Sequence, residues 1–171
     1  KKDYESKQTN IFKAVNADSK QTISTLSEVG YKIQKAPVNF FNDYISVEDY
    51  LSSFDWSKPW DAGAQFSSIS LYNSTFNLDI EDNLTDFIKL KLDNDTGSYF
   101  QKKPESARQI INGAMKVISG LDWLNYPIHL PEKLIDFCLD NKPEFEGCDL
   151  VDYVYVLYKC SEQTSYKKKE I

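Results

Sequence analysis

Residues 104–120, Pro-Glu-Ser-Ala-Arg-Gln-Ile-Ile-Asn-Gly-Ala-Met-Lys-Val-Ile-Ser-Gly, contain the pattern that decides the fold class. Proline is favoured in the first turn of a helix, where its missing N–H is not needed, and glycine is common just after a helix ends. The apolar side chains between them recur on one side at helical spacing, at Ile110, Ile111, Ala114, Val117 and Ile118. The stretch therefore predicts the longest helix of the chain, from Pro104 to about Ser119, with Gly120 as its stop.

Helix signals of the same kind lie on both sides of this stretch. They predict helices over residues 18–29, 46–54, 59–72, 79–92, 131–139 and 149–160. Ser46 and Asp49 have the spacing of a capping box, and Pro59 and Pro131 each suit a first helical position. Residues 93–97, Asp-Asn-Asp-Thr-Gly, predict a turn. Strand signals are scarce, so the sequence predicts an all-α fold.

The segment 149–160 is ambiguous, because its β-branched and aromatic residues favour a strand. We assign it to a helix because of its length, its helical neighbours and Asp149 as its N-terminal cap. Since the segment is apolar on all sides, we expect a buried helix rather than one with a solvated face.

The predicted helices fall into three pairs: 46–54 with 59–72, 79–92 with 104–119, and 131–139 with 149–160. The prediction is a single all-α domain over residues 1–171, built from paired helical hairpins. In this division, residues 1–45 are an N-terminal helical segment, residues 46–160 hold the three hairpins, and residues 161–171 are a frayed tail.

Composition excludes several classes of protein. The chain has 171 residues, 41% of them apolar, and a net charge of −6. No apolar run approaches the ~20 residues of a membrane span, and there is no basic cluster in the body to bind nucleic acid. Cys138, Cys148 and Cys160 form no Cys-x-x-Cys pair, so we expect free, mostly buried thiols rather than a zinc site. Free thiols favour a cytoplasmic location. The chain begins with Lys-Lys rather than Met, so we expect that its native start was processed or was not included.

Short Trp, Gly and Pro motifs within residues 46–160 resemble the joints of α/α-toroid proteins. They are Asp-Trp-Ser-Lys-Pro-Trp-Asp-Ala-Gly at 55–63, Asp-Thr-Gly-Ser-Tyr at 95–99, Ile-Asn-Gly-Ala-Met-Lys at 111–116, Pro-Glu-Lys-Leu-Ile-Asp at 131–136 and Cys-Asp-Leu-Val-Asp at 148–152. The pattern is similar to poorly characterised bacterial proteins of the superfamily of terpenoid cyclases, prenyltransferases and polysaccharide lyases. The resemblance implies a ring of helical hairpins around a central cleft. Three pairs would form only part of a ring, so a truncated, an open and a homodimer-completed ring all remain open.

The polar face of the helix at 104–119 supplies the first candidate ligand-binding residues. Arg108, Asn112 and Lys116 follow one another at helical spacing. On an inner helix of a toroid this face would line the cleft, where Arg108 could bind a carboxylate with its planar fork. Asn112 and Lys116 would donate to an anionic or hydroxyl-rich ligand. The alternative is an ordinary solvated helix face.

Aromatic residues near the helix joints supply the other candidates. Tyr99 and Trp60 could stack on sugar rings, and Tyr99 is the better candidate because we expect the turn before it to be exposed. The alternative is that such aromatics fill the ends of the core.

No catalytic signature is present: the sequence has no phosphate-binding glycine loop, no Gly-x-Ser-x-Gly elbow and no His-Glu-x-x-His. His129, Asp61 and Glu132 are candidate proton-transfer groups, because His is the usual base near neutral pH and carboxylates are the alternative. Whether the protein is an enzyme stays open. The sequence predicts no cofactor and no metal site, since the acidic turn from Asp93 lacks the EF-hand spacing.

Three functions remain open. The first is binding or processing of a carbohydrate, in particular an acidic glycan, in a cleft between inner helices. The second is a non-catalytic helical-repeat module that binds a protein partner. The third is a prenyl or terpenoid pocket, which the missing Asp-rich diphosphate motif disfavours.

Overall fold

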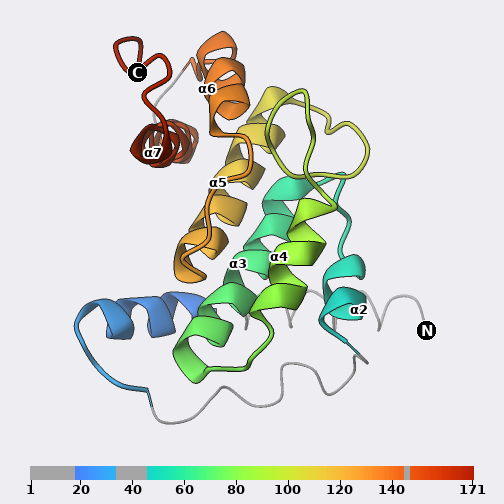
Figure 1. Cartoon of the computed structure of the whole chain (residues 1–171), viewed down its shortest axis with the longest axis vertical. Helices are drawn as coiled ribbons and strands as arrows, with labels where there is room; N and C mark the ends of the chain where they lie inside the picture. The colour runs from blue at the N-terminus through green and yellow to red at the C-terminus, as the bar shows by residue number, and fades with distance from the viewer. Residues whose placement is uncertain (1–17, 34–45, 145–146) are drawn as a thin grey trace.

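The computed structural model describes residues 18–33, 46–144 and 147–171, most of which are helical (Figure 1). Residues 18–28 form a helix, and the labelled helices after it are α2 (Val47–Ser52), α3 (Pro59–Phe76), α4 (Glu81–Lys89), α5 (Ala107–Trp123), α6 (Pro131–Asp140) and α7 (Cys148–Gln163). These described residues contain no strand, only an isolated bridge between Leu92 and Tyr99. The all-α prediction is confirmed. Residues 1–17 and 34–45 of the predicted N-terminal segment lie outside the described part.

The two longest helices, α3 and α5, run side by side at the centre of the fold (Figure 1). Glycine allows them to approach closely. A Cβ atom added at Gly113 would lie 2.5 Å from Pro59 Cβ, and one at Gly63 would lie 3.1 Å from the Gly113 carbonyl oxygen. Real Cβ atoms do not tolerate the first distance, so this contact requires glycine.

The predicted ends of α5 need correction. The helix begins at Ala107 rather than Pro104, because Ser106 caps it: the Ser106 hydroxyl accepts a hydrogen bond from the Gln109 amide at 3.3 Å. Gly120 is not a stop, and the helix continues to Trp123. Gly120 packs against Phe66 of α3, where an added Cβ would lie 2.8 Å from the ring. The left-handed residue that follows the helix is Asn125, with φ 52°.

Two of the three predicted helix pairs are in contact, namely α2 with α3 and α6 with α7. The second pair differs from the prediction: α5 packs along α3 and against α7, whereas α4 packs on α2 and α3. The glycine contacts with α3 explain this choice. A toroid ring stays a prediction.

Helix α5 therefore separates two hydrophobic cores. Its Val117 and Leu121 belong to a core shared with α2, α3 and α4. Its Ile111, Ala114 and Ile118 belong to a second core shared with α6 and α7. The apolar stripe predicted from the sequence is thus divided between two neighbours rather than placed on one.

Helix α7 lies beside α5 and α6 at the edge of the molecule and is seen nearly end-on in Figure 1. Its helical assignment is confirmed, but the prediction of burial on all sides is wrong. Tyr153, Val156, Leu157 and Cys160 are buried, whereas Leu150, Val151, Val154 and Tyr158 are exposed. The described structure has no element on that outer side.

The residues after α7 fold back onto α6 instead of fraying. Lys167 Nζ lies 2.8 Å from Asp136 Oδ1, and the Thr164 hydroxyl donates to Glu132 Oε1 at 2.9 Å. As expected, the three cysteines are free; Cys138 and Cys160 are buried, whereas Cys148 is exposed. No helix among the described residues is long and apolar enough to span a membrane.

Candidate functional site

The predicted polar face of α5 lies where α3, α5 and α7 meet, so it is not simply a solvated face. Arg108 of α5 lies over the ring of Trp60 in α3, with its guanidinium carbon 5.2 Å from the ring centroid. One turn later, Asn112 is 1% exposed. Further along, the Ser119 hydroxyl lies 2.6 Å from the Ser67 hydroxyl of α3. We call this line of α5 side chains, Arg108, Asn112, Lys116 and Ser119, the polar seam.

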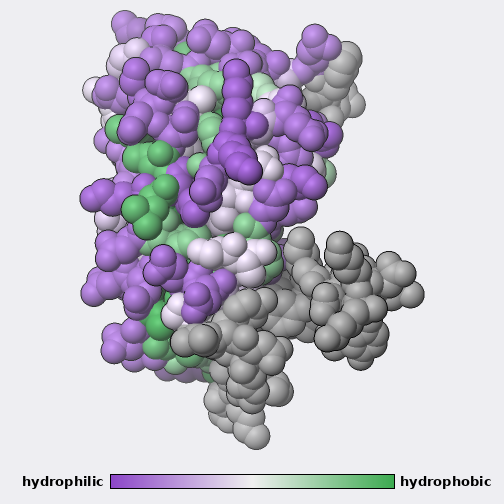
Figure 2. All heavy atoms as spheres, turned by 90° about the vertical axis from the view of Figure 1, so that its right-hand side faces the viewer, coloured by the Kyte–Doolittle hydropathy of each residue, from purple (hydrophilic) through white to green (hydrophobic). Residues whose placement is uncertain are grey.

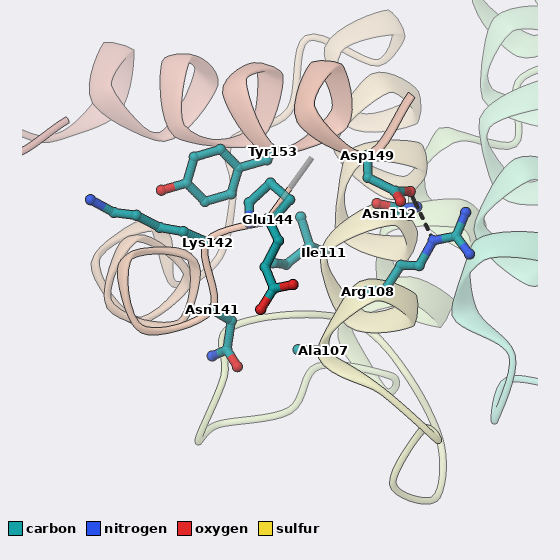
Figure 3. A pocket seen from close by; sticks show the side chains of 10 residues that line it. Ala107, Arg108, Ile111, Asn112, Asn141, Lys142, Glu144, Asp149 and Tyr153 are labelled. Atoms are coloured by element: carbon teal, nitrogen blue, oxygen red, sulfur yellow. Dashed lines mark hydrogen bonds and ion pairs between the residues drawn. The ribbon is translucent and has the colours of Figure 1, made fainter. Parts of the chain in front are cut away.

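A pocket of about 370 Å³ opens beside the first part of the polar seam (Figure 3). It lies between the start of α5, the connection from α6 to α7 and the start of α7. The lining residues are Ala107, Arg108, Ile111, Asn112, Asn141, Lys142, Pro143, Glu144, Asp149 and Tyr153. In Figure 3, Ile111 lies in the middle, with Tyr153 and Glu144 on one side and Asn112 and Asp149 on the other.

Asp149 is the centre of the hydrogen-bond network at this pocket. Its Oδ1 accepts from Asn112 Nδ2 at 2.8 Å and from Arg108 Nε at 2.9 Å. These hydrogen bonds, first that of Asn112 and then that of Arg108, lower the pKa of Asp149 below its ordinary value. Asp149 is therefore ionised at neutral pH. It is not the predicted N-cap of α7, because Gly147 occupies that position and the Asp149 side chain joins α7 to α5 instead.

Arg108 and Asn112 are thus brought together, as their spacing suggested, but on a carboxylate of the protein itself. The Arg108 side chain is 59% exposed, and its guanidinium points away from Glu144 and Tyr153 (Figure 3). Since Asp149 neutralises it at Nε, Arg108 offers a ligand carboxylate only its outer edge.

Lys116 and Trp60, the next two predicted ligand residues, do not line the pocket. Trp60 is half-buried, and its ring packs against the Arg108 guanidinium. Lys116 lies further along the polar seam, where its charge partly offsets the burial that raises the pKa of Asp152.

Lys20 extends the polar seam to the helix at 18–28. Its ammonium donates to the Ser67 hydroxyl at 2.6 Å. Burial, and then the charge of Lys116, lower the pKa of Lys20 from 10.5 to about 8. Ser67 itself is fully buried, so no ligand reaches this hydroxyl.

Tyr99 contradicts the expectation of an exposed aromatic, because it is 0% exposed. Its hydroxyl lies 3.1 Å from His129 Nδ1 and accepts from the His129 amide at 3.3 Å. The Tyr99 hydroxyl and His129 Nδ1 therefore share one hydrogen bond, in which the tautomer of the imidazole decides which atom donates. Trp56 is also buried, at 3% exposed. For Tyr99, the alternative that the aromatic ring fills the core is right.

His129 is partly buried, in surroundings that favour the neutral imidazole. Burial, and then the charge of Lys89, lower its pKa below the ordinary value. Its Nε2 atom is buried without a hydrogen-bond partner among the described residues. Together with Glu132 it lines a second cavity of about 610 Å³, but Glu132 accepts from Thr164 there. Asp61 is exposed in the first turn of α3 and lines neither cavity.

The three candidate proton-transfer groups therefore do not assemble into one site. Within residues 18–33, 46–144 and 147–171, no group of three or more His, Cys, Asp and Glu side chains could hold a metal ion.

Sequence reasoning missed most of the pocket wall. Asn141, Lys142 and Glu144 follow α6, and Tyr153 lies one turn into α7. They gather here because α7 folds back across the start of α5, a contact that helical spacing cannot reveal. Asp149 was the residue from which sequence analysis could have predicted part of this site. It is a carboxylate near the start of a predicted helix, and Arg108 is the single arginine of the chain.

Comparisons of the chain with protein-family models, with curated proteins and with solved structures found no match. The site is therefore interpreted from its own geometry.

Proposed function

We propose that this chain is a binding module whose pocket between α5 and α7 takes a small, neutral, hydroxyl-rich ligand of the carbohydrate class. The observation that carries the proposal is the pocket lining: carboxylates and amides stand beside apolar side chains and a tyrosine ring. Sugars combine polar hydroxyl edges with apolar ring faces, and this mixture of groups suits both.

The polar half of the pocket supplies acceptors for hydroxyl groups. Both hydrogen bonds to Asp149 go to Oδ1, and none of the described residues donates to its Oδ2. Oδ2 therefore keeps its lone pairs for a ligand hydroxyl. Because Asn112 and Arg108 fix the carboxylate in place, little side-chain entropy is lost when a ligand binds.

The charge of the lining favours a neutral ligand over the acidic glycan expected from the sequence. Arg108 and Lys142 are opposed by Glu144 and Asp149. Since Arg108 is already paired with Asp149, an anionic sugar gains no net attraction and would meet the Glu144 carboxylate.

The test is a calorimetric or NMR titration of the purified chain with neutral monosaccharides and disaccharides, uronic acids and an isoprenoid diphosphate. We expect the neutral sugars to bind. Asp149→Asn should weaken neutral-sugar binding about tenfold, since one charged acceptor is worth about 1.5 kcal/mol or more. The same change releases Arg108, so binding of uronic acids should increase.

Asp86→Asn is the matched control, because it makes the same charge change on the exposed face of α4, away from the pocket. Neutral-sugar binding that is equal in the wild type, in Asp149→Asn and in Asp86→Asn would contradict the proposed site. Binding of the isoprenoid diphosphate alone would contradict the carbohydrate class and favour the prenyl alternative.

A further inference from the structure

The outer side of α7 is an apolar helix face without a partner among the described residues. Leu150, Val151, Val154 and Tyr158 are 41%, 67%, 54% and 55% exposed. Their spacing places them on one stripe, which we call the α7 outer face. The charged residue within this span, Asp152, is only 6% exposed and lies on the other side of the helix.

Among the described residues, the other exposed helix faces are polar. On α4 the exposed residues are Glu81, Asp82, Asn83, Asp86 and Lys89. Figure 2, which looks onto the side of the molecule that carries α2, shows mainly hydrophilic residues with a narrow hydrophobic strip. A helix that is apolar on all sides is normally buried on all sides. The α7 outer face is therefore expected to be covered by a further surface.

We propose that the covering surface is a second copy of this chain, with the two α7 helices packed antiparallel about a two-fold axis at Val154. A two-fold interface requires a patch that is complementary to itself. Leu150 and Tyr158 each lie four residues from Val154, so the axis brings Leu150 of one copy against Tyr158 of the other. The small Val154 side chains at the axis allow the helices to approach.

The charges at the two ends of α7 favour the antiparallel arrangement. Gly147 occupies the N-cap of α7 and has no side chain that could accept from the first amides of the helix. Glu162 near the other end has a side chain that is 45% exposed, and its Oε2 atom forms an ion pair with Lys159 of the same helix at 3.2 Å. Antiparallel packing places this carboxylate beside the N-terminus of the partner's α7, where the helix dipole stabilises negative charge. Parallel packing would instead place the two Glu162 carboxylates together.

The size of the α7 outer face determines how tightly the two copies are expected to bind. A standard interface buries about 800 Å² on each partner, more than four side chains of one helix provide. We therefore expect a dimer with a dissociation constant in the micromolar range, which dilution takes apart. This inference does not depend on the sugar pocket, whose test uses a different set of residues.

The first experiment is sedimentation equilibrium over a range of protein concentrations that spans the micromolar region. The wild-type chain should pass from monomer to dimer. Val154→Glu should be monomeric throughout, because it places two like charges at the axis, while its melting curve stays close to that of the wild type. Val29→Glu is the matched control, since Val29 is 74% exposed and lies outside α7; this variant should still dimerise.

Cysteine cross-linking tests the axis itself, in a Cys148→Ser background that removes the exposed thiol. Under mild oxidation Val154→Cys should give a covalent dimer, because a residue on a two-fold axis meets its own copy. Tyr158→Cys alone should not, whereas Tyr158→Cys mixed with Leu150→Cys should. A wild-type chain that is monomeric at every concentration, or cross-linking of Tyr158→Cys to itself, would overturn the proposal.

Discussion

Helices α5 and α7 are nearly equal in length, with 17 and 16 residues, but the fold treats them differently. Helix α5 lies between two cores and packs against α3 through Gly113 and Gly120. Helix α7 has one face in the second core and one face without a neighbour among the described residues. The comparison teaches that an apolar sequence predicts a helix whose surface must be buried, but not the element that buries it. Glycines on one face of a helix determine which neighbouring helix can pack closely against it.

The largest expected effect is a difference in stability between two substitutions in α7, one on its buried face and one on its outer face. Leu157→Ala removes a side chain that is 5% exposed and should cost about 3 kcal/mol of unfolding free energy. Leu150→Ala, on the outer face, should change the free energy of the monomer by less than about 0.5 kcal/mol. Urea denaturation at low protein concentration measures both. Equal losses for the two variants would mean that the faces are not different.

The next effect tests the close contact between α3 and α5. Gly113→Ala should destabilise the fold by about 2 kcal/mol, because its Cβ would lie 2.9 Å from the carbonyl carbon of Pro59. In a helix without such a contact the same substitution is stabilising, because alanine is favoured over glycine by about 1 kcal/mol. Gly63→Ala, with its closest contacts at 3.1 Å, is the control and should cost less. Stabilisation by Gly113→Ala would show that the helices are further apart.

The polar seam beside this contact predicts a dependence of stability on pH. The pKa of Lys20 is about 8 in the fold and 10.5 as the ordinary value. Between these two pH values the unfolded chain binds more protons than the native chain, so the free energy of unfolding rises with pH. Below pH 8 Lys20 is charged in both the native and the unfolded chain, and its burial destabilises the fold.

Lys20→Met should remove this rise and should stabilise the fold at pH 7. The measurement is the difference in denaturation free energy between the variant and the wild type from pH 7 to pH 10, which cancels the contributions of other groups. A difference that does not change with pH would show that the Lys20 ammonium is solvated.

The smallest effect is expected at the edge of the first core, where Tyr99 bonds to His129. Tyr99→Phe should cost about 1 kcal/mol, since it leaves the His129 amide without its acceptor. It should also change the pKa of His129, because the imidazole loses its hydrogen-bond partner at Nδ1. His129 is the single histidine of the chain, so one NMR titration curve reports it. Tyr31→Phe, at an exposed tyrosine, should change neither quantity.

Much of the fold could be predicted from the sequence because it is local. Proline positions, capping residues and helical spacing located the helices. Several boundaries were wrong: those near Pro104, Gly120 and Asp149, the end of α3, which extends to Phe76, and the end of α4, which stops at Lys89. The errors at Gly120 and Asp149 share a cause: both have the residue types of helix ends, but each is used for a contact with another helix. In the sequence, a glycine or a carboxylate that makes a tertiary contact cannot be distinguished from one that ends or caps a helix.

The candidate site was less predictable. The spacing of Arg108 and Asn112 placed both residues on one face of α5, where the structure joins them to Asp149, because those residues share a helix. The rest of the pocket comes from segments that meet only through folding, such as Glu144 and Tyr153. Tyr99 failed as an exposed ligand residue because the chain after the turn pairs back at Leu92 and carries it into the core.

The contrast between α5 and α7 is tested most directly by hydrogen–deuterium exchange at low and high protein concentration. Amides of α5 should be strongly protected at both concentrations, because that helix lies between two cores. Amides of α7 should exchange faster at low concentration and gain protection at high concentration, as the outer face becomes covered by a second copy. Protection of α7 that equals that of α5 and does not change with concentration would contradict the account.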